Sequence, residues 1–236
     1  MNDLTVLGID TSGKTASCAI LRDGVLLGET TLYTKLTHSQ VTLPLVQKLI
    51  DDCGLTLDDI DLVAVSDGPG SYTGLRIGIS AVKGICFAGK SCVGVSTLEA
   101  LAYNCLCAKA TVFSVLAARP GIVYFGGYRA DGETLDNIIP DGVYNLDELK
   151  TVSEEIEGDI ILVGDCASDV KQKLFTDNAN VRMASIPDRL QKASSVCLCA
   201  LAHKDEWGSA QSLNARYLQI TKAEKDLKEG NLKHDK

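Results

Sequence analysis

Several features are missing from this 236-residue sequence, and each absence narrows the class of protein. There is no apolar run long enough to cross a bilayer and no charged-then-apolar segment after Met1, which predicts a soluble, non-exported, cytoplasmic protein. Basic residues are not in excess: 23 Lys and Arg against 31 Asp and Glu give a net charge of −8, which argues against an extended RNA- or DNA-binding face. The length and the 45% hydrophobic content predict one globular unit, or two small lobes, that folds without disulfides.

Metal-binding patterns are also missing, although nine cysteines are present. Most lie in apolar segments such as ASCAIL and KGICFAG, which predicts reduced thiols in the core. Two pairs are spaced C-x-C, namely Cys105/Cys107 and Cys197/Cys199, and residues two positions apart on a helix project from different faces. The histidines stand far apart, and we assign none of them a second ligand at helical spacing: His38, His203 and His234. We therefore predict no metal site.

In the first half of the chain, the spacing of apolar residues predicts a definite order of strands and helices. Three alternating segments predict an antiparallel meander, followed by a helix from a cap at Ser39 to Gly54. The predicted order is βββαβαβα, with strands at 4–10, 15–21, 24–33, 60–66 and 91–96 and helices at 39–53, 74–88 and from Thr97. The second half is predicted to hold strands at 110–118, 122–132 and 159–165 and helices near 146–149, 168–175 and 194–204. From Gly208 we expect an extended and then frayed tail.

Two glycine-containing segments raise the question of phosphate binding. The stretch SDGPGSYTGLRIGIS, residues 66–80, is typical either of a phosphate cradle at a helix N-terminus or of a tight strand-to-helix turn. Residues 8–15, GIDTSGKT, match G-x-x-x-x-G-K-[ST]. A P-loop requires a helix after this motif, whereas Thr15 is followed by a strand-like pattern, so the Walker A interpretation is unfavourable.

The elements DTS (10–12), HS (38–39), GPGSYTGLRIG (68–78), VGVSTLEALA (93–102) and ARPGIVY (118–124) resemble the TsaB (YeaZ) family. Later segments, NARYLQ and KAEK, resemble it weakly. The resemblance implies an α/β fold of the actin/Hsp70/sugar-kinase (RNase H-like) type. Its expected parts are a first lobe at 1–108, a reduced second lobe at 109–206 and an extended tail at 207–236. In such a fold Asp10, Thr11 and Ser12 are interpreted as a vestigial nucleotide loop.

The resemblance also implies a function. Members of this family are the non-catalytic partner of TsaD, which transfers threonylcarbamoyl to N6 of adenosine 37 in tRNAs reading ANN codons. The implied partners are TsaD in a heterodimer, TsaE, and a second copy of the chain when TsaD is absent, with tRNA reached indirectly. No intrinsic cofactor is expected, and ATP or ADP is admitted only at a shared interface. TsaD carries paired histidines at helical spacing, whereas His38 is followed by SQVT. The alternative is an ATP-binding enzyme of the actin/sugar-kinase type or, less favoured, a P-loop NTPase.

The helix after the glycine loop has an unusual composition, because Gly74, Gly78 and Gly84 each cost about 1 kcal/mol relative to Ala in a helix interior. Glycines at these positions would be explained if a second helix approaches α-helical residues 74–88 closely, or if every face of this helix is packed in the core. Given the resemblance, we predict that the helices at 39–53 and 74–88 form a subunit interface through Leu45, Leu49, Leu75, Gly78, Ile79, Val82 and Cys86. We predict no catalytic residues and no metal ligands. The sequence departs from the family pattern at Gln40, Ala117, Pro120 and Ile122.

Overall fold

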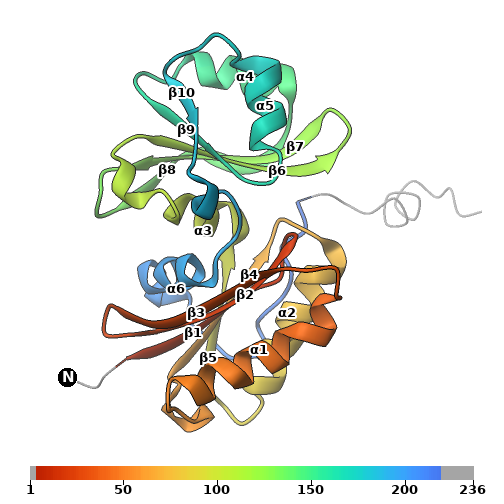
Figure 1. The fold of residues 1–236 in the computed structure, drawn as a ribbon, viewed down its shortest axis with the longest axis vertical. Coiled ribbons are helices and arrows are strands. Elements are labelled where there is room, and N and C mark those ends of the chain that lie inside the picture. The colour runs from red at the N-terminus through yellow and green to blue at the C-terminus, as the bar shows by residue number, and fades with distance from the viewer. Residues whose placement is uncertain (1–3, 219–236) are drawn as a thin grey trace, which may run out of the picture.

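Two five-stranded sheets form the framework of the protein in a computed structural model, which describes residues 4–218 (Figure 1). The strands of the first sheet are β1 (Thr5–Asp10), β2 (Thr15–Arg22), β3 (Val25–Tyr33), β4 (Leu62–Gly68) and β5 (Ser91–Ser96), in the order β3-β2-β1-β4-β5. The first hairpins are antiparallel, whereas β1, β4 and β5 run parallel. Every residue of β1 and β4 is buried, as expected of central strands covered on both faces.

The second sheet repeats this topology. Its strands are β6 (Thr111–Arg119), β7 (Ile122–Ala130), β8 (Leu135–Asn145), β9 (Ile160–Val163) and β10 (Val181–Met183), in the order β10-β9-β6-β7-β8. Antiparallel pairing joins β6, β7 and β8, and parallel pairing joins β6, β9 and β10. Read from the third strand, both sheets follow the same 3-2-1-4-5 order, so the chain contains two related lobes.

Helices cover the two sheets in layers (Figure 1). The outer face of the first sheet packs against α1 (His38–Asp52) and α2 (Tyr72–Ile85), and that of the second against α4 (Leu146–Glu154) and α5 (Ala167–Leu174). Between the sheets lie α3 (Thr97–Tyr103) and α6 (Ala193–Ala202), which contact each other. Among the described helices, none combines the length and the apolar character needed to span a membrane.

The two inner helices exchange lobes. Helix α3 follows the last strand of the first sheet but packs largely on β6 and β7, where Leu98 and Leu101 are buried. Helix α6 follows the second sheet but packs on β1 and β2 through Val196, Cys197 and Ala200. The predicted second lobe, 109–206, therefore includes a helix whose apolar surface completes the core of the first sheet.

The element order predicted for the first half is confirmed, with small shifts at the ends. Helix α1 is capped at Thr37 rather than Ser39: the Gln40 side chain accepts the Thr37 backbone N–H at 3.1 Å, which closes a capping box. In the second half, β8 and β10 were missed. Pro140 and Gly142 interrupt the apolar alternation of β8, and β10 has only three residues.

The chain after α6 returns to the first sheet. Gly208 forms reciprocal backbone hydrogen bonds of 2.9 Å with Cys92 in β5, and Leu213 is buried in the core beneath α1 and α2. The Arg216 backbone N–H donates to the carbonyl oxygen of Asp67 at 2.7 Å. The first eleven residues of the predicted tail after Trp207 are thus part of the packed fold. The mixed-charge run KAEKDLKEGNLKHDK lies outside the described residues.

Candidate functional site: closed phosphate loops and an exposed helix face

The turn between β1 and β2 carries the candidate nucleotide loop, and its polar groups are occupied by the protein itself. Asp10, Thr11 and Ser12 are at most 1% exposed. The Asp10 carboxylate accepts the Ser12 backbone N–H at 2.9 Å, the Ser12 hydroxyl at 2.7 Å and the Ser66 hydroxyl at 2.5 Å. Burial raises the pKa of Asp10, while these hydrogen bonds oppose the rise. The Thr11 hydroxyl donates to the Gly74 carbonyl oxygen at 2.7 Å.

The glycine-rich loop lies directly on this turn. A Cβ added at Gly70 would stand 2.4 Å from the Ser12 carbonyl oxygen, and one at Gly74 would stand 2.1 Å from that of Thr11. The Ser71 backbone N–H, at the start of α2, donates to the Ser12 carbonyl oxygen at 2.7 Å. The glycines thus permit close approach between two backbone segments. Of the two interpretations of residues 66–80, the tight packed turn fits this geometry, because the loop backbone lies against the β1–β2 turn and the Ser71 N–H is already paired.

The P-loop alternative lacks its helix. Thr15 begins β2, which pairs antiparallel with β1, so the segment after Lys14 turns back along the sheet.

His38 stands at the start of α1, and its Nε2 lies 2.9 Å from the Gly13 carbonyl oxygen, so Nε2 carries the proton. The residue four positions later is Thr42, whose hydroxyl donates to the His38 carbonyl oxygen at 2.7 Å.

The residues predicted to form the interface do not face outward, and this corrects the orientation expected for both helices. They lie in the core or at its margin: Leu45 is partly buried, and the buried ones are Leu49, Leu75, Gly78, Ile79, Val82 and Cys86. A Cβ added at Gly78 would be 2.5 Å from the Thr11 hydroxyl oxygen. The small residues at 74 and 78 therefore admit the β1–β2 turn rather than a partner helix. A partner would contact α1 and α2 through other residues.

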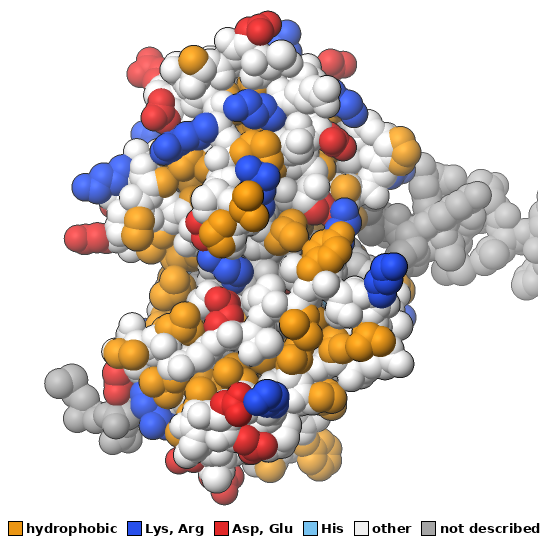
Figure 2. All heavy atoms as spheres, viewed as in Figure 1, with side chains coloured by type: hydrophobic (Ala, Val, Ile, Leu, Met, Phe, Trp, Pro, Cys, Tyr) orange, Lys and Arg blue, Asp and Glu red, His pale blue; other side chains and the backbone are white. Residues whose placement is uncertain are grey.

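The outward face of these helices contains an apolar groove of about 530 Å³, lined by Ser39, Thr42, Leu43, Tyr72, Thr73, Arg76, Ile77, Ser80 and Ala81. Leu43 is 52% exposed and Tyr72 is 42% exposed. Gly84 continues the row of small residues outward, since a Cβ added there would meet no atom within 4 Å. In Figure 2 hydrophobic side chains gather over the part of the lower lobe where Figure 1 shows α1 and α2.

One edge of the groove is ordered by a stacked aromatic cluster. The rings of Tyr72 and Tyr217 stack with centroids 4.9 Å apart, and the Arg76 guanidinium lies 4.0 Å from the centroid of the Tyr72 ring. Arg76 Nε donates to the Tyr217 hydroxyl at 3.1 Å. Exposed aromatic residues and arginine are enriched at protein interfaces, so this edge and the apolar groove beside it form the candidate partner-binding surface.

Comparisons with known proteins give this geometry a family. The family described as TsaD, tRNA N6-adenosine threonylcarbamoyltransferase, matches residues 32–203. A Bacillus subtilis protein named tRNA threonylcarbamoyladenosine biosynthesis protein TsaB is 33% identical over 172 residues, which are 72% of this chain and 75% of that protein. A transferase of the TsaD name from Protochlamydia amoebophila is 28% identical over 54% of this chain and 41% of its own length.

The solved structure of YeaZ from Pseudomonas aeruginosa matches with a TM-score of 0.76 at 25% identity, over 91% of this chain and 100% of that one. EutJ from Carboxydothermus hydrogenoformans matches with a TM-score of 0.50 at 10% identity, over 82% and 89% of the two chains, which concerns the fold alone. The chain belongs to the TsaB (YeaZ) family. Both the resemblance and the two-lobed actin/Hsp70/sugar-kinase-like fold are confirmed.

Proposed function

We propose that this chain is a non-catalytic subunit that supports a TsaD-type enzyme in transferring threonylcarbamoyl to N6 of adenosine 37 in tRNAs reading ANN codons. The observation that carries the proposal is the similarity of one chain to proteins of both names, TsaB and the transferase itself. Two homologous proteins that act in one modification are natural candidates for a complex in which one partner keeps the chemistry.

The supporting role is consistent with the loops of the first lobe. A phosphate bound there would need free backbone N–H groups and open space, whereas the Ser71 N–H is paired and the Asp10–Ser12 turn is buried. His38 has no histidine partner four residues later and is hydrogen-bonded to Gly13. These features disfavour the alternative, an ATP-binding enzyme of the actin/sugar-kinase type.

The partner surface that fits best is the outer face of α1 and α2. A homologue with the same fold would carry an equivalent helix pair, and two such pairs can meet about a two-fold or pseudo-two-fold axis. The same face would serve a second copy of this chain when the transferase is absent. Small residues on it, Ser80, Ala81 and Gly84, allow helices to approach closely, while Leu43 and Tyr72 supply apolar area.

The remaining partners follow from this arrangement. TsaE would join through the complex, and tRNA would be reached indirectly, since the net charge of −8 disfavours an extended nucleic-acid face. We assign no nucleotide to the chain alone, and ATP or ADP would bind only at an interface shared with the transferase.

The test is binding of the full chain to a TsaD-type protein on a sizing column. Leu43→Asp and Ser80→Arg place charges on the exposed groove and should weaken association by about one to two powers of ten, with thermal unfolding of the free chain unchanged. The matched control is Ile186→Asp, which makes the same kind of change at a residue 80% exposed on the second lobe and should bind normally.

Normal association of both groove variants would show that the partner docks elsewhere. The alternative function is tested separately with Lys14→Ala, which would abolish nucleotide binding if GIDTSGKT were a P-loop. We expect negligible ATP turnover by the chain alone and nearly intact tRNA modification with Lys14→Ala. ATP turnover by the lone chain that disappears in Lys14→Ala would favour the enzyme instead.

A further inference from the structure

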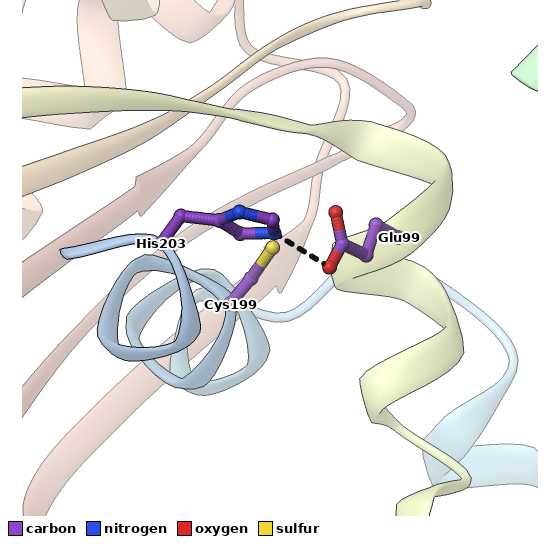
Figure 3. Close-up of side chains that lie close together, drawn as sticks. All are labelled: Glu99, Cys199 and His203. Carbon is purple, nitrogen blue, oxygen red and sulfur yellow. Dashed lines mark hydrogen bonds and ion pairs between the residues drawn. The ribbon is translucent and has the colours of Figure 1, made fainter. Parts of the chain in front are cut away.

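Three side chains with different ligand atoms meet where α3 and α6 cross between the two sheets. Glu99 extends from α3, and Cys199 and His203 extend from the last turn of α6 and the residue after it (Figure 3). One carboxylate oxygen, one sulfur and one ring nitrogen all lie within 4.8 Å of one another. His203 Nε2 is 2.8 Å from Glu99 Oε1, and in Figure 3 the Cys199 sulfur points toward both. We propose that Glu99, Cys199 and His203 form a binding site for Zn²⁺ or a similar thiophilic divalent cation.

The donor set matches the chemistry of zinc. A thiolate, an imidazole and a carboxylate are all zinc ligands, and bonds of about 2.0 to 2.3 Å place tetrahedral ligand atoms roughly 3.3 to 3.6 Å apart. The three atoms would need shifts of only about 1 Å to reach this spacing. One thiolate and one carboxylate would also neutralise the two positive charges of the ion, so that it could be held in a partly buried place.

The surroundings favour a cation. The site lies at the C-terminus of α6, where the helix dipole is negative. The second ring nitrogen of His203, Nδ1, is 3.5 Å from Glu206 Oε1, as in the carboxylate–histidine pairs that orient metal-bound imidazoles. The Cys199 side chain is fully buried, whereas the Glu99 and His203 side chains are 19% and 34% exposed, so solvent reaches two of the three side chains.

The prediction that His203 has no second ligand-type side chain at helical spacing overlooked Cys199. Cys199 lies four residues earlier, which places both side chains on one face of α6. A bound ion would link α3 to α6, and thereby the two helices that join the lobes.

The experiment uses the full chain, reduced and freed of metal with a chelator, and then titrated with Co²⁺ and with Zn²⁺. We expect one Co²⁺ per chain, with a thiolate-to-cobalt charge-transfer band and the intense visible bands of tetrahedral coordination. Zn²⁺ should displace Co²⁺ and raise the melting temperature in proportion to the logarithm of its concentration. The single tryptophan, Trp207, donates its indole N–H to the Ala200 carbonyl oxygen at 2.8 Å, so its fluorescence provides a local second readout.

Cys199→Ser should lose the charge-transfer band and bind Zn²⁺ at least tenfold more weakly. Losing a residue that only orients a metal ligand already weakens metal binding by about tenfold or more, and losing the ligand itself should weaken it at least as much. The matched control is Cys107→Ser, which removes an exposed thiol and should keep the band. If Cys199→Ser fails to fold, the partly exposed His203→Gln takes its place, and it should weaken Zn²⁺ binding to the same extent. Absence of stoichiometric binding, a band that survives Cys199→Ser, or an unchanged Zn²⁺ affinity in His203→Gln would show that the cluster is only a Glu–His ion pair beside a buried thiol.

Discussion

The two lobes share one strand order, but the turn between their first two strands is packed differently in each lobe. In the first lobe, the β1–β2 turn tucks under α2, and Thr11 and Ser12 are fully buried. In the second lobe, the corresponding β6–β7 turn is the short Pro120–Gly121 pair, and both residues are exposed. A cavity of about 350 Å³ remains beside it, lined by residues of the hairpin, by Leu146, and by α5 residues such as Asp169 and Lys173.

The helices next to these turns differ in a corresponding way. Helix α2 carries Gly74 and Gly78, and added Cβ atoms there would lie 2.1 and 2.5 Å from atoms of Thr11. Helix α5 contains no glycine. Gly74 and Gly78 in α2 therefore accommodate the β1–β2 turn of the same chain, whereas Gly84 in that helix meets no such neighbour. The family departures Ala117, Pro120 and Ile122 all line the open cavity of the second lobe.

The largest expected effect comes from filling the contact between α2 and the turn. Gly78→Leu should unfold the chain or lower its free energy of unfolding by about 3 kcal/mol or more, since overpacking has no room to relax against the turn and Val65. Gly84→Leu is the matched control in the same helix, where an added Cβ meets nothing, and it should fold at least as well as the natural chain. Thermal and denaturant unfolding of the two variants and the natural chain measure these differences in stability. Equal stabilities would mean that the turn does not hold α2.

A second difference between the lobes is a buried acid. The residue before Gly68 is Asp67, whereas the residue before Gly164, at the same place in the second lobe, is Val163. Burial raises the pKa of Asp67 to about 7, although the Arg216 guanidinium, 3.4 Å away, opposes the rise, and nearby Glu206 adds to it.

Between pH 4 and pH 7, Asp67 is therefore protonated in the folded chain and ionised in the unfolded chain. Its contribution lowers the free energy of unfolding as pH rises, by at most about 1.4 kcal/mol per pH unit. Asp67→Asn should remove this slope, so the difference between the two stability curves should change between pH 4 and pH 7 and level off above. A constant difference across that range would contradict the raised pKa.

The smallest effect is expected in the open cavity of the second lobe. Ala118→Leu adds three carbons where space exists, and it should change the free energy of unfolding by less than about 1 kcal/mol in either direction. Urea unfolding of the variant and the natural chain gives the comparison. A loss as large as that of Gly78→Leu would show that the second lobe is packed as tightly as the first.

Much of this protein is determined by local sequence. Apolar alternation located strands β1 to β7 and β9, and helical spacing located the six α-helices of the described residues, because these patterns depend only on near neighbours. The motifs DTS, GPGSYTGLRIG and ARPGIVY were enough to indicate the family, and the strand-like pattern after Thr15 was enough to reject a P-loop. Strand β8 escaped because Pro140 and Gly142 break its alternation, although its pairing with β7 stabilises it.

Which face of each element points inward depends on contacts between segments that are distant in the sequence. The stripe of Leu75, Ile79 and Val82 could equally have met a partner, and it is buried because the first sheet and the β1–β2 turn cover it. The same holds for Glu99 and His203, which are separated by 104 residues and meet only because α3 and α6 cross between the sheets. Periodicity shows that a helix has an apolar side. Which neighbour covers that side depends on contacts between distant segments, and no local pattern encodes those contacts.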